Sequence, residues 1–180
     1  MVDSERRKNL ALNLRRLSVG VITNDEFENN ISETVSFGWL PEQYYRSEKA
    51  KNDDPVIIPM LELSWGMYSD LKNHKLTGAD KLPDESLKII ARLILFLQSD
   101  REYEWPRFEF NNPLLKFSFK DFLLSILTFG KFYRDKKRQQ EIAFNHFKSL
   151  GDYDYWPFFK YKDYVQQLNI PPFLTGKERI

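Results

Sequence analysis

The stretch that decides the fold is PDESLKIIARLILFLQS, residues 83–99. A proline followed by two acids is typical of a helix start, because proline has no amide hydrogen to leave unpaired and acids favour the positive end of a helix. Apolar side chains then occupy two sides of the helical wheel: Leu87, Ile90, Ile94 and Leu97 on one, and Ile89, Leu93 and Phe96 on the other. A helix that is apolar nearly all round belongs at the centre of a bundle. We therefore predict a central helix from Pro83 to about Ser99.

The segments before this helix carry their own start and stop signals. Asp3 or Ser4 can cap a first helix that ends before Gly20. Thr23 followed by Glu26 is a capping-box pattern, which predicts a short second helix.

A third start signal is Asp54-Pro55, and an apolar stripe at helical period follows it from Ile57 to Leu71. The polar stretch before it, residues 47–54, is predicted to be an exposed loop.

Helical patterns continue after residue 99, at Phe119–Leu127, Ile142–Leu150 and Asp163–Leu168, whereas only Phe108–Phe110 suggests a short strand. No long Gly/Ser-rich or Pro-rich linker divides the chain. The predicted fold class is therefore all-α. We expect residues 1–180 to form a single helical domain, a bundle of about five to seven helices with aromatic-rich loops, at most minor strand and frayed termini such as Thr175–Ile180.

Composition excludes several classes of protein. The chain has 180 residues, of which 42% are apolar and 16% aromatic, so it is not intrinsically disordered. It has no Cys, which removes disulfides and thiolate chemistry and fits a reducing compartment. No apolar core follows the charged N-terminus, and the longest apolar run, Phe122–Gly130, spans only about 14 Å as a helix. We therefore expect a cytoplasmic protein with no membrane segment.

Candidate catalytic residues are scarce. His74 is expected near a helix C-terminus and His146 on the core face of a helix, and neither has a carboxylate or a second His at metal-ligand spacing. The sequence contains no nucleophile elbow, no phosphate-binding loop and no dinucleotide fingerprint. We therefore expect no cofactor, no metal and no catalytic residue. The sequence leaves enzymatic activity open, with the balance against it.

Two similar loops stand out: DREYEWP at residues 100–106 and DYDYWP at residues 152–157. Proline restricts the preceding tryptophan to extended geometry, and Trp and Tyr beside acids suit a binding surface for a basic partner. The candidate partner-binding residues are Asp100, Glu102, Tyr103, Glu104, Trp105, Asp152, Asp154 and Trp156. The competing interpretation is structural: the aromatic side chains anchor the loops in the core while the acids face water.

The leading hypothesis is a non-catalytic cytosolic protein-binding module, for example an immunity- or antitoxin-like protein that covers a basic partner. One alternative is a metal-dependent hydrolase with Asp and Glu ligands from the two loops. A second alternative is nucleic-acid binding through the basic residues Arg134, Lys136, Lys137 and Arg138.

Charge argues against nucleic acid as the partner, because Lys and Arg total 27 while Asp and Glu total 26. Asp135 and Glu141 also flank the basic cluster. The cluster can therefore be a solvated helix start with no role in nucleic-acid binding. Arg6, Arg7 and Lys8 are interpreted in the same way, as solvated. Arg92, inside the apolar helix, is expected to form a structural ion pair rather than a substrate clamp. Glu102 or Glu104 can reach it only if the loop after the helix folds back.

Replacement of Ile94 by Ala tests the central helix. The truncation should lower the free energy of unfolding by about 2–5 kcal/mol, because it removes buried methyl groups and leaves a cavity. Denaturant unfolding measures the change. A loss below about 0.5 kcal/mol, the range of surface substitutions, would show that the helix is peripheral.

Overall fold

The computed structural model describes residues 1–36, 38, 48–106, 128, 131–172 and 174. This part of the chain is mostly helical and bundle-like, without a sheet, which confirms the predicted all-α class. The one bridge of β type described there joins Thr23 to Lys75. The seven described α-helices are α1 (Ser4–Ser18), α2 (Asn24–Ser32), α3 (Glu48–Asn52), α4 (Ile57–Trp65), α5 (Asp84–Leu97), α7 (Lys131–Ser149) and α8 (Tyr161–Leu168), with 3-10 turns at Gly78–Asp80 and Tyr153–Tyr155.

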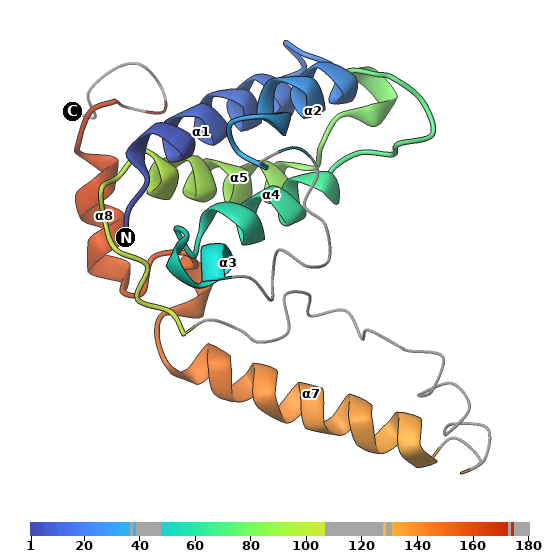
Figure 1. The fold of residues 1–180 in the computed structure, drawn as a ribbon, viewed down its shortest axis with the longest axis vertical. Helices are drawn as coiled ribbons and strands as arrows, with labels where there is room; N and C mark the ends of the chain where they lie inside the picture. The colour runs from blue at the N-terminus through green and yellow to red at the C-terminus, as the bar shows by residue number, and fades with distance from the viewer. Residues whose placement is uncertain (37, 39–47, 107–127, 129–130, 173, 175–180) are drawn as a thin grey trace.

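Helices α1 and α5 lie side by side at the centre of the bundle (Figure 1). The carboxylate of Asp3 caps α1 by accepting a hydrogen bond from the amide of Arg6 at 3.1 Å, as the sequence predicts. On α5, Leu93 and Ile94 are buried, which confirms the central position of this helix. Ile89 is 45% exposed, however, so the prediction of a second apolar side through Ile89 is wrong. The first two turns of α5 reach the surface, and only its second half is enclosed.

Helices α2 and α4 complete the bundle against α1. The predicted capping box starts α2: the amide of Thr23 donates to Glu26 at 2.8 Å, and the amide of Glu26 donates to the Thr23 hydroxyl at 3.2 Å. The apolar side chains of Phe27 and Ile31 then turn inward and are buried.

Two expectations around α4 are wrong. Helix α4 begins at Ile57 rather than at Asp54-Pro55 and ends at Trp65, so the apolar stripe does not continue as a helix to Leu71, which is 96% exposed. The chain leaves the helix at Gly66, whose amide donates to the Leu63 carbonyl in a tighter turn. The predicted exposed loop at residues 47–54 contains the short helix α3, none of whose residues is buried.

The N-terminal arginines are buried, which overturns the prediction that they are solvated. The guanidinium of Arg7 is fully enclosed and forms a two-pronged ion pair with Asp54, at 2.6 Å through Nε and 3.0 Å through Nη2. Arg6 pairs with Asp53 and donates to the Val35 carbonyl at 2.6 Å. Lys8 alone of the three is exposed, as predicted. Residues 53–54 are thereby tied to α1 across a long sequence separation.

Helices α7 and α8 follow the central helices in the chain. Helix α8 packs on α5, while α7 lies along one edge of the molecule (Figure 1). Helix α7 begins at Lys131, before the predicted Ile142–Leu150 segment, and takes in the charged stretch at residues 134–138. Thr128 supports this start, because its carbonyl accepts from the Lys131 amide and its hydroxyl from the Phe132 amide.

Some predictions fall on residues that the structure does not describe: the strand at Phe108–Phe110, the helix at Phe119–Leu127, most of the apolar run Phe122–Gly130, and the frayed end Thr175–Ile180. The assignment of residues 1–180 to one domain stays a prediction. Within the described ranges, no helix is long and apolar enough to cross a bilayer.

Replacement of Asp54 by Asn tests the buried ion pair. The change should lower the free energy of unfolding by about 3–5 kcal/mol, because it leaves the Arg7 guanidinium buried without a counter-charge. Glu48→Gln is the matched control, since it removes one carboxylate charge from an exposed pair with Lys51 and should leave stability nearly unchanged. Urea unfolding of both variants measures the difference. Equal effects would contradict a structural role for the buried pair.

Candidate functional site

The two acidic-aromatic loops, which the sequence separates by some fifty residues, lie against each other. The indole Nε1 of Trp156 donates to the hydroxyl of Tyr103 at 2.9 Å, and the indole Nε1 of Trp105 donates to the carbonyl of Phe158 at 3.2 Å. Each loop thus gives one tryptophan hydrogen bond to the other. This reciprocal pair of bonds fixes the first loop, which follows α5, against the second loop, which joins α7 to α8.

Aromatic packing reinforces the contact. The ring of Trp105 lies 4.8 Å from Phe147 of α7 and 5.1 Å from Phe159, measured between centroids. Tyr153 meets Trp105 edge-on at 6.1 Å and Phe144 at 5.6 Å. Trp105 is therefore the centre of a cluster that attaches α7 to the second loop.

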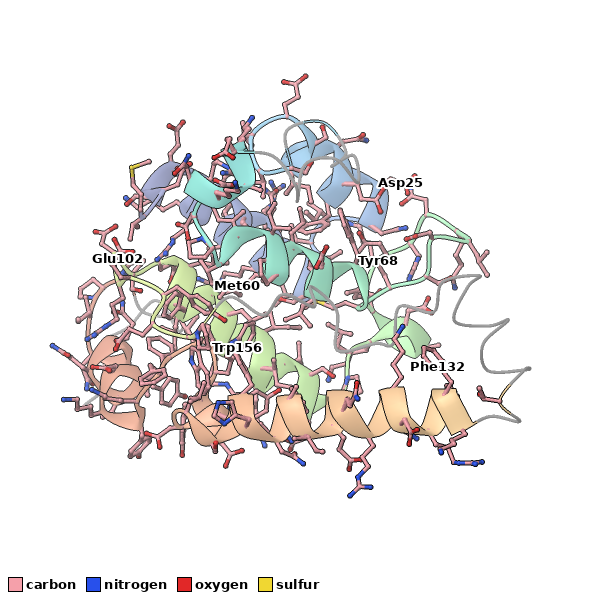
Figure 2. All side chains as sticks on the ribbon, turned by 60° about the horizontal axis from the view of Figure 1, so that its bottom comes forward. Asp25, Met60, Tyr68, Glu102, Phe132 and Trp156 are labelled. Atoms are coloured by element: carbon pink, nitrogen blue, oxygen red, sulfur yellow. The ribbon has the colours of Figure 1, made fainter. Side chains whose placement is uncertain are left out.

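The predicted aromatic site residues are placed inward. Trp105 is only 2% exposed, and Tyr103 and Trp156 are partly buried against the core. In Figure 2, Trp156 lies among packed side chains, whereas Glu102 lies at the rim of the molecule. The aromatic side chains thus anchor the loops, as the structural interpretation expected. The acids of the same loops remain exposed on the outer side of these anchors.

The five predicted acids are all exposed but differ in what they contact. The carboxylate of Asp152 accepts from the Tyr161 amide at 2.7 Å, which supports the start of α8. Asp100 accepts from the hydroxyl of Ser4 at 2.6 Å, and Glu102 lies 3.9 Å from the N-terminal amine.

Glu104 and Asp154 differ from the other three acids, since their carboxylates have no hydrogen bond or ion pair to any described residue. Glu102, with its long contact to the chain terminus, joins them as a carboxylate open to solvent. We call Glu102, Glu104 and Asp154 the loop acids.

Two arginines tie the loops to the bundle. Arg92 of α5 donates to the backbone carbonyl of Asp154, so the expected ion pair with Glu102 or Glu104 is wrong. The guanidinium of Arg92 bonds to the backbone of the second loop and not to a carboxylate of the first. Arg101 pairs with Asp163 of α8 at 3.1 Å and donates to Gln166 at 2.6 Å. The second loop is therefore held at its backbone, and the first loop through the side chain of Arg101.

Tyr103 has the most informative electrostatics of the site. Burial raises the pKa of its phenol from 10.0 to about 12, because the charged phenolate would lose its hydration. The bond from the Trp156 indole opposes the increase in pKa, since a donor stabilises the phenolate, and the nearby Tyr153 adds to it. The phenol is thus neutral near pH 7 and acts as a fixed acceptor for the indole.

Neither histidine lies where the sequence predicts. His74 lies in a loop, not at a helix C-terminus as expected: its amide donates to Asn24 at 2.7 Å and its Nδ1 lies 2.9 Å from the Lys72 carbonyl. His146 is exposed, so its predicted place in the core is wrong. Phe147 occupies the inward position of α7, and the residue before it points about 100° away. No group of three potential metal ligands occurs among the described residues.

The predicted basic cluster lies on the first three turns of α7. Arg134, Lys137 and Arg138 are exposed, whereas Lys136 is half-buried and has contacts of its own. The structure therefore separates this cluster into three outward cations and one that faces the body.

Comparisons with known proteins add nothing to this geometry: no family model, no curated protein and no solved structure matches the chain.

Replacement of Tyr103 by Phe tests the bond between the loops through its dependence on pH. Below pH 10 the folded and unfolded chains both hold the phenol proton, so the full contribution of Tyr103 is present. Between pH 10 and about 12 the unfolded chain loses that proton first, so wild-type stability falls. Urea unfolding at pH 8, 10 and 11 should show a shallower fall in Tyr103→Phe than in the wild type. Parallel curves would contradict the raised pKa.

Proposed function

We propose that this chain is a non-catalytic protein-binding module that uses the loop acids to recognise a basic partner. The observation that carries the proposal is the reciprocal tryptophan bonding between the two loops. It supports a surface on which Glu102, Glu104 and Asp154 flank the bonded pair Tyr103–Trp156 in sequence and remain exposed.

Preorganisation favours binding at this surface. Backbone atoms of both loops are already held: the Asp154 carbonyl by Arg92, the Phe158 carbonyl by Trp105, and the Arg101 carbonyl by Arg7 at 2.7 Å. A partner would therefore not have to order these segments, and the entropy cost of association would be lower.

Charge supports the choice of a basic partner. Exposed carboxylates at the rim of an interface mainly raise the association rate of an oppositely charged protein, and salt weakens the effect. An immunity- or antitoxin-like role, in which the loop surface covers a basic partner's own site, is one concrete form of the proposal. A cytosolic setting fits the absence of Cys from the chain.

The metal-dependent hydrolase has less support. The two loops meet through their aromatic residues, and their described carboxylates do not gather into a group of three potential ligands. Asp152, one of the acids that this alternative needs, is already bonded to the Tyr161 amide.

The test is a capture experiment with a triple variant, E102Q/E104Q/D154N. Wild type and variant are immobilised, nuclease-treated extract of the source cell is passed over them, and retained proteins are quantified by mass spectrometry. We expect at least one basic protein to be retained by the wild type and reduced about tenfold, or 1.4 kcal/mol, on the variant. Salt should weaken its retention.

The matched control is E33Q/D70N/E85Q, which makes the same charge change at exposed positions outside the two loops. Melting temperatures of both variants establish that they fold. The proposal is wrong if the wild type retains no basic protein, or if the control loses it as completely as the loop-acid variant.

A further inference from the structure

Helix α7 carries a basic face that the overall charge of the chain conceals. The helix has six Lys or Arg against two Asp or Glu, while the remaining residues have 21 against 24. Four of its cations lie within the first eight residues of the helix and are exposed: Lys131, Arg134, Lys137 and Arg138. We call these four residues the basic face. None of them has an ion pair in the described part of the chain.

The basic face points away from the body of the protein. At 100° per residue, Arg134 and Arg138 project nearly opposite to Ala143 and Phe147. Phe147 is buried against Trp105, and Ala143 is partly buried, so they mark the inward side of the helix. Figure 2 shows α7 along the edge of the molecule with charged side chains projecting outward from it.

The position of these charges is unfavourable for the helix itself. Cations near a helix N-terminus oppose the macrodipole, and the first turn of α7 contains no acid to compensate. Thr128 already accepts the amides of Lys131 and Phe132, so the capping of the helix does not need the cations. Lys131 and Arg134, in the first turn, thus cost helix stability, and none of the four cationic side chains makes a described fold contact. This is the pattern expected where a negatively charged ligand binds.

We propose that the basic face of α7 binds the phosphodiester backbone of a nucleic acid. Arg134 and Arg138 are one turn apart, about 6 Å along the helix, and all four cations span about 10 Å. A helix about 10–12 Å wide matches the major groove of a duplex, about 12 Å across. Lys and Arg on phosphates position a protein without reading bases, so the binding is electrostatic and independent of sequence.

The residues of the basic face favour nucleic acid over other anionic partners. A protein interface needs a cluster of apolar or aromatic anchors at its centre. Between Lys131 and Arg138 the exposed side chains are the four cations, Asp135 and a single aromatic residue, Tyr133. A membrane-surface helix needs a free apolar face beside the basic one. On α7, Phe147 packs against Trp105 and Phe144 contacts Tyr153. The exposed apolar side chains Tyr133, Ile142 and Leu150 point in different directions at 100° per residue, so they form no continuous apolar face.

Fluorescence anisotropy with two labelled probes tests the proposal: a duplex DNA of about 20 base pairs and a single-stranded RNA of similar length, titrated between about 50 and 200 mM salt. The full-length wild type should bind at low salt. The logarithm of its association constant should fall linearly as the logarithm of the salt concentration rises. For the duplex, R134Q/K137Q/R138Q should reduce the slope by about 0.9 for each phosphate that the variant no longer neutralises. Tighter binding of one probe identifies whether the basic face fits a duplex or a single-stranded phosphodiester backbone.

The control variant K8Q/R16Q/K162Q removes three exposed cations from α1 and α8 and should keep the wild-type slope. The single variants R134Q and R138Q check the triple variant, since each should reduce the duplex slope by about 0.9. Circular dichroism should show that α7 persists, because Gln forms helices about as well as Lys and Arg, and R134Q removes a charge that opposes the dipole.

Three results would overturn the proposal: no binding of either probe by the wild type at about 50 mM salt, an equal loss in the control variant, or equal or tighter binding of polyglutamate or anionic vesicles. These outcomes leave the loop acids untouched, so this proposal and the protein-binding proposal fail separately.

Discussion

The buried ion pair between Arg7 and Asp54 is the interaction on which the rest of the structure depends. Both side chains are completely enclosed. A buried charge is tolerated only when its hydrogen-bonding capacity is satisfied. Arg7 meets this condition with two bonds to Asp54 and two to the carbonyls of Ser99 and Arg101. Asp54 in turn accepts the amides of Asp3 and Val56.

This ion pair also determines where the candidate site lies. By binding the carbonyls of Ser99 and Arg101, Arg7 sets the direction in which the chain leaves α5. The next residues bring Tyr103 to Trp156 and Trp105 to the Phe158 carbonyl. The position of the exposed loop acids is therefore coupled to a charge buried inside the bundle, through a short run of backbone.

Sequence patterns predicted what short-range chemistry controls. The cap at Asp3, the capping box at Thr23 and the buried half of α5 all follow from residues within a few positions of one another. The same patterns did not predict contacts between residues that are far apart in the chain. Nothing local shows that Arg7 will meet a carboxylate 47 positions away, although the doublets Arg6-Arg7 and Asp53-Asp54 were visible as opposite charges.

In the candidate site, too, the sequence indicated local features but not the contacts between distant residues. The repeated acid-aromatic composition pointed to both loops, but the indole bonds between them depend on tertiary packing. The basic cluster was visible as well, and the neutral chain argued against its use. Only the helix position of each residue separates the outward Arg134 and Arg138 from the half-buried Lys136. The exposed His146 was missed for that reason too, because one step along α7 from Phe147 changes the direction of a side chain.

The aromatic contacts of α7 have a consequence for both charged surfaces. Among the described residues, its ring contacts lie in its last two turns, where Phe144 and Phe147 meet Tyr153 and Trp105. The basic end at Lys131 is about 20 Å away along the axis. Trp105, which contacts Phe147 and Tyr153 in this cluster, lies next to Glu104 in the chain. One indole ring therefore packs against the helix that carries the basic face and adjoins a loop acid, so the two charged surfaces share one packing element.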